Sequence, residues 1–306
     1  MVFAELERAP DDRFRMKIGS PAHRDLFCTT FIETHRPFEP ESLPWPRLEG
    51  ALLERLRAFP LWSYARTIER RAGQMVTAFA QTVTDPLIRE AVALQGYEET
   101  RHARLMQHVL DRYGIEAPDL QTPPAPATRE DFVVFGYGEC TDSFLGFGAF
   151  ALARAKQLFP AAILDIFDQV LFEEARHITF FVNWFRYEEK RAGRDRFGER
   201  HLAAVRGCYE AVAGALRGER GGVAPEFPAS AAAQFSDFLD GLTPVAFLEA
   251  ALAENRRFLS RLDPRLPKPG VVPALARLAL LAIRALPPRG ESVAARSPAG
   301  QHGVAA

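Results

Sequence analysis

Four stretches of the chain repeat apolar residues every three to four positions, which is the period of an amphipathic α-helix. The first starts at Leu61, the second covers 85–113, the third covers 131–157, and the fourth starts at Pro160. The proline-rich segment 115–130 is long enough to cross from one end of a helix bundle to the other. The pattern therefore predicts an all-α fold, a four-helix bundle with a long crossover.

The second stretch has clear signals at both of its ends. Asp85 can cap the first turn and Pro86 fits the first helical position. Gly114 can adopt the left-handed conformation that ends many helices. We therefore expect a long helix that ends at Tyr113.

The chain on either side of the four stretches is different in character. Prolines recur through 1–46, and we expect an irregular arm with short helical pieces. Beyond about residue 190 the helical period returns after a change in composition. We expect helices at 47–58, 191–217, 243–262 and 271–286, and a loop at 218–228. The predicted division is an arm at 1–46, the bundle at 47–190, accessory helices packed on it at 191–288, and a disordered tail at 289–306.

Acids and histidines interrupt the apolar stripes of the four predicted helices near mid-length. Two of the helices carry a glutamate followed three residues later by a histidine, and such a pair lies on one helix face. The other two carry a single glutamate. Acids on a core-facing stripe are more informative than acids on a solvated face. The six residues are Glu69, Glu99, His102, Glu139, Glu174 and His177.

Four carboxylates in a dry interior are prohibitive without counter-charge, because each unpaired buried carboxylate costs several kcal/mol. Two divalent cations would balance them and leave the two neutral imidazoles as further ligands. A set of oxygen and nitrogen ligands suits iron or manganese. The alternative is a set of ordinary charges on solvated helix faces together with one or two satisfied core histidines, which becomes less attractive when all six fall on apolar stripes.

The spacing and order of these six residues resemble the ferritin-like di-iron carboxylate superfamily, over about residues 60–188. That resemblance implies a ferritin-like bundle that holds two iron ions and activates O2, with a manganese–iron pair as a second option. In the hydroxylases and desaturases of the superfamily, the acid before the ligand glutamate accepts a hydrogen bond from a metal-bound histidine. By resemblance this role falls to Glu98 and Glu173, with Arg101 and Arg176 as their partners. Solvent-facing positions for all four are the alternative.

The third predicted helix carries two further signals. Ser143 lies one turn after Glu139, where hydroxylases of the superfamily place a hydroxyl near the O2 site, so we take it as a candidate catalytic residue. Four glycines flank Glu139 at 136, 138, 146 and 148, which indicates either close helix packing or an apolar cavity beside the metals. The 24 phenylalanines of the chain favour an apolar wall in either case.

Two positions separate the chain from particular subfamilies. Met106 stands where reductase subunits carry their radical tyrosine, and Val170 stands where arylamine N-oxygenases carry an additional histidine. The subfamily is therefore not identified.

Charge and composition exclude other classes. A net charge of -1 gives no reason to expect nucleic acid as a partner. The three cysteines form no CxxC pair, which argues against a disulfide framework or a thiolate metal site. No signal peptide or membrane span is evident, and we expect a cytoplasmic protein. The apolar helix at 271–286 either packs on the body or lies on a membrane surface.

The expected function is that of an O2-dependent di-iron oxidoreductase that oxygenates a small or medium apolar organic substrate. Electrons must come from a separate ferredoxin or flavoprotein reductase, because the chain shows no flavin, nicotinamide or iron–sulfur signature. The alternatives are an iron-binding or peroxide-scavenging protein without an organic substrate, a desaturase-type enzyme, and a bundle without metal. A homodimer also stays open.

Overall fold

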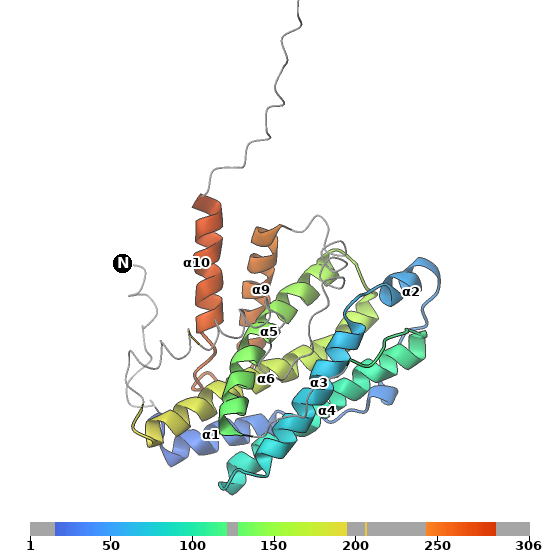
Figure 1. Cartoon of the computed structure of the whole chain (residues 1–306). Helices are drawn as coiled ribbons and strands as arrows, with labels where there is room; N and C mark the ends of the chain where they lie inside the picture. Colours follow the sequence, from blue (N-terminus) through green and yellow to red (C-terminus); the bar gives the residue numbers. More distant parts are fainter. Residues whose placement is uncertain (1–15, 121–127, 195–205, 207–242, 286–306) are drawn as a thin grey trace, which may run out of the picture.

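The computed structural model describes residues 16–120, 128–194, 206 and 243–285 (Figure 1). Within these residues every regular element is a helix, which confirms the all-α prediction. The predicted helix 191–217, the loop 218–228 and the tail 289–306 lie wholly or almost wholly outside the described residues. None of the described helices combines the length and apolarity needed to cross a membrane.

Four long helices occupy the stretches that the apolar period predicts. In α4, the Asp85 side chain accepts hydrogen bonds from the backbone N–H groups of Leu87 and Ile88, and Gly114 ends the helix at a φ of 59°. In α5, Thr128 and Asp131 form a capping box. The helices are α3 (Trp62–Ala80), α4 (Pro86–Tyr113), α5 (Arg129–Ala155) and α6 (Ala161–Arg191).

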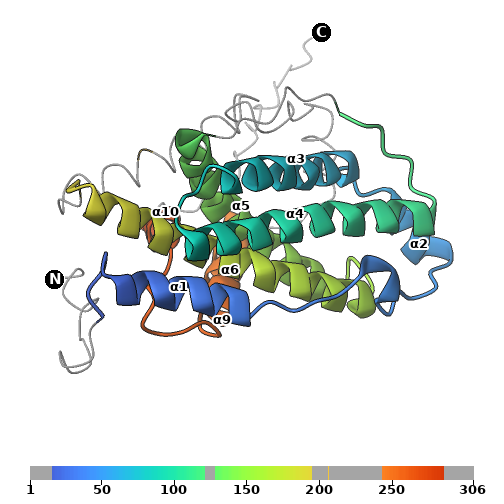
Figure 2. The same cartoon turned by 90° about the horizontal axis from the view of Figure 1, so that it is seen from below.

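Helices α3 and α4 lie side by side along their length (Figures 1 and 2). Two glycines make this close approach feasible. A Cβ atom on Gly73 would lie 2.9 Å from the backbone nitrogen of Thr100, and one on Gly96 would lie 2.9 Å from that of Thr77. This contact fixes where Glu69 on α3 stands relative to the polar residues of α4.

Helix α1 (Pro21–Glu33) has 13 residues and is longer than the short helical pieces that we expected in the arm 1–46. Its N-cap is Ser20, and Pro21 occupies the first turn, where proline is tolerated. One side of α1 is buried against α4 and α6, and His23 contacts Asn183 there, with 3.0 Å between Nε2 and Oδ1. The other described prolines of this region follow α1, where the chain forms the short 3-10 helix η3 (Pro40–Ser42).

Three further helices complete the described structure. Helix α2 (Gly50–Arg57) falls within the predicted 47–58. Helix α9 (Pro244–Leu259) packs on α5 and α6, and α10 (Val271–Ala285) packs on α9 and α5 (Figure 1). The outer side of α10 still exposes Leu275, Leu278 and Leu281.

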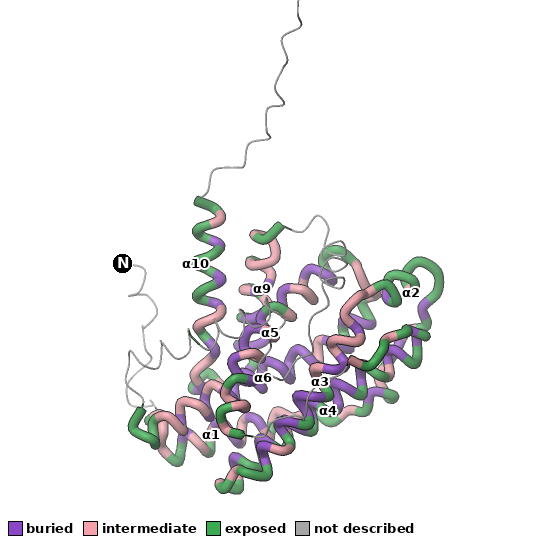
Figure 3. The backbone as a smooth tube through the Cα atoms, viewed as in Figure 1, coloured by how far each residue is buried: buried purple, intermediate pink, exposed green. Residues whose placement is uncertain are grey.

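Buried residues follow the facing sides of the long helices (Figure 3). They form two large apolar clusters. One surrounds Phe79, Phe132 and Trp184, with ring centroids of Phe79 and Phe132 only 4.4 Å apart. The other surrounds Trp62 and Phe167. Along α4 and α6, the predicted site residues lie where one cluster gives way to the other, so apolar packing holds them from both ends.

Candidate metal centre

Five of the six predicted ligand residues converge from three helices. The Nδ1 atom of His102 lies 3.1 Å from Glu174 Oε1 and 3.4 Å from Glu69 Oε2. The Nδ1 atom of His177 lies 3.0 Å from Glu99 Oε1 and 3.5 Å from Glu174 Oε2. Glu69, Glu99, His102 and Glu174 each offer a ligand atom within 4.8 Å of the others. Glutamate and imidazole groups at this spacing fit a metal centre.

Glu139, the sixth predicted ligand, comes from α5 and is not part of this tight set. It is close enough to be influenced by its charges. Burial raises the pKa of Glu139 well above its ordinary value, and the carboxylates of Glu174 and Glu99 raise it further. Glu139 therefore lies near the same cluster, although no hydrogen bond or ion pair within the described residues joins it to the other five.

Three buried atoms of the cluster have no hydrogen-bond partner within the described residues: Nδ1 of His102, Nδ1 of His177 and Oε2 of Glu174. The nearby carboxylate oxygens lie close to the two Nδ1 atoms, but the angles do not allow a hydrogen bond. Buried polar atoms are rarely left in this state. A cation between the helices would satisfy all three atoms at once, so the residues present fit a bound metal.

The pKa shifts of the cluster show that its buried charges need to be balanced when no metal is bound. Burial raises the pKa of Glu69 to about 8. Burial favours neutral imidazoles, but nearby carboxylates outweigh it and raise the pKa of both His102 and His177. Burial would raise the pKa of Glu174, yet the two histidines lower it. Without metal, therefore, protons neutralise the carboxylates that cations would otherwise balance.

The outward nitrogen of each histidine meets an acid on the opposite helix. His102 Nε2 on α4 lies 2.8 Å from Glu173 Oε2 on α6, and His177 Nε2 on α6 lies 2.8 Å from Glu98 Oε2 on α4. Both acids are buried, so neither faces solvent. An acid on Nε2 holds the proton there and leaves the Nδ1 lone pair for a metal.

Two buried arginines complete this layer, and they also cross between helices. Arg176 Nη1 donates to Glu98 Oε1 over 2.6 Å, and Arg101 donates to Glu173. These charge-assisted bonds lock the acids that hold the histidines. Glu98 and Glu173 also approach His35, as a second group of potential ligands. We assign no metal to that group, because both acids already bind a guanidinium and an imidazole.

Helix α1 and the residues after it cover this layer, and the sequence analysis missed them. His35 Nδ1 lies 2.6 Å from Glu98 Oε1, and Arg176 Nε donates to Thr34 Oγ1 over 2.9 Å. Arg176 also donates to the Phe31 carbonyl oxygen. The pair Ser20-Pro21 repeats the helix-start signal of Asp85-Pro86 and could have revealed α1.

The glycines of α5 divide into two kinds. A Cβ on Gly136 would lie 2.1 Å from the Phe181 ring, and one on Gly148 would lie 2.9 Å from the Cβ of Ala251, so both mark close packing. A Cβ on Gly138 would have no described atom within 4 Å.

Ser143 is buried, and its hydroxyl has no hydrogen-bond partner within the described residues. Its predicted role near O2 stays a prediction.

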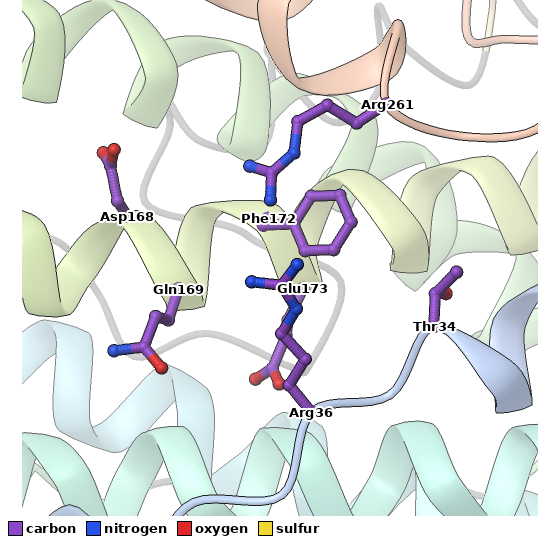
Figure 4. A pocket seen from close by; sticks show the side chains of 7 residues that line it. All are labelled: Thr34, Arg36, Asp168, Gln169, Phe172, Glu173 and Arg261. Carbon is purple, nitrogen blue, oxygen red and sulfur yellow. The ribbon is translucent and has the colours of Figure 1, made fainter. Parts of the chain in front are cut away.

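A pocket of about 190 Å³ lies beside the site, next to Phe172 and Glu173 rather than near Gly146, where the sequence left close packing and an apolar cavity as alternatives (Figure 4). Its lining is mainly polar, and Phe172 is the aromatic residue among the residues that form it. Gly146 itself has only Leu171 nearby, at 3.9 Å.

The structure thus presents an all-helical protein with a buried carboxylate and histidine cluster that is suited to metal ions. Each histidine contacts a buried acid on the opposite helix, and that acid is in turn bound by an arginine. Comparison of the chain with family models, with curated proteins and with solved structures found no match.

Proposed function

We propose that this protein is an O2-activating di-iron oxidoreductase built on a ferritin-like bundle. The observation that carries the proposal is the pair of imidazoles whose Nε2 atoms are held by buried acids and whose Nδ1 atoms face the carboxylates without a hydrogen-bond partner. Two iron ions bound there would supply the redox chemistry of O2 reduction. The six ligands are Glu69, Glu99, His102, Glu139, Glu174 and His177.

The chain's own groups would position and neutralise the centre. Glu174 lies near both histidines, at 3.1 Å from His102 Nδ1 and 3.5 Å from His177 Nδ1, so it can serve both metal positions. Glu99 is similarly shared, although it lies 3.9 Å from His102 Nδ1. Glu69 and Glu139 hold protons in the absence of metal and would release them on binding.

The substrate under this proposal is a small or medium apolar molecule, and electrons come from a ferredoxin or a flavoprotein reductase. Support for an apolar substrate comes from the phenylalanines of the helices that carry the ligands, such as Phe144 and Phe147 on α5 and Phe181 on α6, which are nearly completely buried. Gly138 precedes Glu139 and leaves space where a side chain would lie, and Ser143 follows Glu139 by one turn. Both favour entry of the substrate to the centre from the side of α5.

The second candidate is an iron-binding or peroxide-scavenging protein without an organic substrate. One observation favours it: the pocket that opens beside the site is lined mainly by polar residues. Both candidates use the same ligands. They differ in whether the reduced centre reacts faster with O2 or with hydrogen peroxide.

The test begins with full-length protein loaded with ferrous iron under anaerobic conditions. Metal analysis is expected to give about two iron ions for each chain. The loaded protein is then mixed either with O2 or with hydrogen peroxide, and the optical spectrum and oxidant consumption are followed. Faster reaction with O2 supports the oxidoreductase, whereas preferential consumption of peroxide supports the scavenger.

A matched pair of variants on α4 controls this experiment. Glu99→Ala removes a buried predicted ligand, and Glu90→Ala removes an exposed acid from the same helix. Circular dichroism checks that both fold. We expect Glu99→Ala to lose iron and O2 reactivity while Glu90→Ala keeps both. Less than about one iron ion bound to the unaltered chain, or equal binding by the two variants, would overturn the proposal.

A further inference from the structure

The pocket beside Glu173 is formed by three separate parts of the chain. Thr34 and Arg36 come from the segment after α1, and Arg261 comes from the turn after α9. Helix α6 contributes Asp168, Gln169, Phe172 and Glu173 (Figure 4). The backbone carbonyl of Arg36 accepts a hydrogen bond from Arg101 Nη1 over 3.2 Å. That bond ties one wall of the pocket to the buried arginine layer.

Two guanidinium groups converge on one aromatic ring in this pocket. The Cζ atom of Arg261 lies 3.8 Å from the ring centroid of Phe172, and that of Arg36 lies 5.5 Å from it. Figure 4 shows the two side chains reaching toward this ring from opposite directions. Stacking on an aromatic face fixes the plane of a guanidinium and leaves its N–H edges free to donate.

Neither guanidinium has an acid partner among the described residues. Asp168, the nearest candidate, is already engaged by Arg154 and Arg257, at 3.4 Å from each. Figure 4 shows its carboxylate pointing away from Arg36 and Arg261. Arg36 and Arg261 are both exposed to solvent. Partial burial and the positive charges of Arg36 and Arg257 lower the pKa of Arg261, and the charge of Asp168 opposes this effect only in part. The pocket therefore holds more positive charge than the described residues neutralise.

Glu173, the second acid in the lining, does not neutralise Arg36 or Arg261 either. Glu173 is buried, and its two oxygens contact Arg101 and His102. Gln169 adds a neutral amide to the lining. Two arginine forks and an amide match the donors that recognise planar or tetrahedral oxyanions, and the ring of Phe172 orients the guanidinium groups.

We infer that this pocket binds a small molecule through a carboxylate or phosphate group held by Arg36 and Arg261. A bound oxyanion would offset the repulsion between the two like charges, and its oxygens would accept the N–H groups that the described residues leave without acceptors. This inference does not depend on the metal centre, because neither arginine touches a predicted ligand.

Calorimetric titration of the full-length, iron-free protein at fixed low ionic strength tests it. Inorganic phosphate and succinate serve as separate probes, so that the tighter one identifies the group that the pocket prefers. We expect saturable binding of at least one probe. Arg36→Gln and Arg261→Gln should each weaken it about tenfold or more, since each removes charge-assisted hydrogen bonds to the oxyanion.

Arg55→Gln is the matched control, because it removes one exposed arginine from α2 and changes the net charge equally. Its affinity for the probe should equal that of the unaltered chain. Unchanged thermal melting verifies that the pocket variants fold. Absence of binding by both probes, or an equal loss in Arg55→Gln, would contradict the inference.

Discussion

At the scale of single residues, the two nitrogens of each site histidine have different environments. Nε2 of His102 contacts Glu173, while its Nδ1 faces Glu174 and Glu69. His177 repeats this arrangement with Glu98 outside and Glu99 inside. An imidazole in neutral form can donate from one nitrogen only. When a metal replaces the proton on Nδ1, the buried outer acids would keep the remaining proton on Nε2.

The Glu173→Gln variant tests the importance of this arrangement. Glutamine keeps the shape of the side chain but removes the charge that holds His102 and Arg101. We expect iron affinity to fall about 10–100-fold, the usual cost of losing such an outer partner. Anaerobic iron titration measures it. Asp165→Asn, an exposed acid on the same helix, should bind iron as the unaltered chain does.

A second residue-scale prediction concerns Lys268, in the turn before α10. Its Nζ donates to the Asp263 carbonyl over 2.8 Å, and burial lowers its pKa to about 8, despite the opposing charge of Asp263. Between this value and the ordinary pKa of lysine, the unfolded chain binds a proton that the folded protein does not. The free energy of unfolding should therefore rise as the pH increases from about 8 to 10.

Urea unfolding at several pH values measures this effect. In Lys268→Met the rise above pH of about 8 should be smaller than in the unaltered protein, because the titrating group is gone. Lys156→Met removes an exposed lysine and should keep the full rise. Identical pH profiles for all three proteins would show that Lys268 titrates normally.

At the scale of elements, the sequence predicted the long helices and their inner faces well. On α4, the whole face that the apolar period assigns to the core is buried: Ile88, Val92, Gln95, Glu99, His102, Met106 and Val109. The period of apolar residues indicates which face of a helix is turned to the core, and this holds for any packing partner. The period does not indicate which helix packs against that face. The pairing of Arg101 with Glu173 therefore became visible only in three dimensions.

Helix α1 escaped prediction for a different reason. The abundance of prolines in 1–46 suggested irregular structure, yet Pro21 stands at the first turn of the helix, where it does no harm. The glycines of α5 left close packing and an apolar cavity as alternatives. Glycine can indicate either close packing or open space, and Gly136 and Gly138 show that both occur within one turn of α5.

Two glycine substitutions should therefore change stability in opposite directions. Gly96→Ala would force a Cβ against the backbone of Thr77, which packs at 2.9 Å, and should cost about 1–3 kcal/mol. Gly138→Ala meets nothing within 4 Å and should stabilise α5 by about 0.5–1 kcal/mol through helix propensity. Urea unfolding of both variants provides the comparison. Destabilisation by Gly138→Ala would mean that its apparent open space is needed.

At the scale of the whole molecule, the cluster brings α3, α4, α5 and α6 together around charges that only cations or protons can balance. Ferrous iron should therefore stabilise the folded chain as a whole. At a free concentration of about 100 times the dissociation constant, one site contributes about 2.7 kcal/mol. Anaerobic thermal melting should show an increase of several degrees, and chelation should reverse it.

Glu99→Ala provides the counterpart to that melting experiment, since it lacks a predicted ligand. Iron should raise its melting temperature little or not at all. An equal increase in both proteins would indicate that iron binds elsewhere on the chain.

The crossed contacts between α4 and α6 carry a consequence for how sequences of this kind can diverge. Glu98 contacts Arg176 and His177, which are 78 and 79 residues away along the chain. A change at Glu98 therefore cannot be compensated from its own helix. In related sequences, substitutions at 98 should be accompanied by substitutions at 176 or 177, and those at 173 by substitutions at 101 or 102. Covariation would then join the two helices in a crossed pattern.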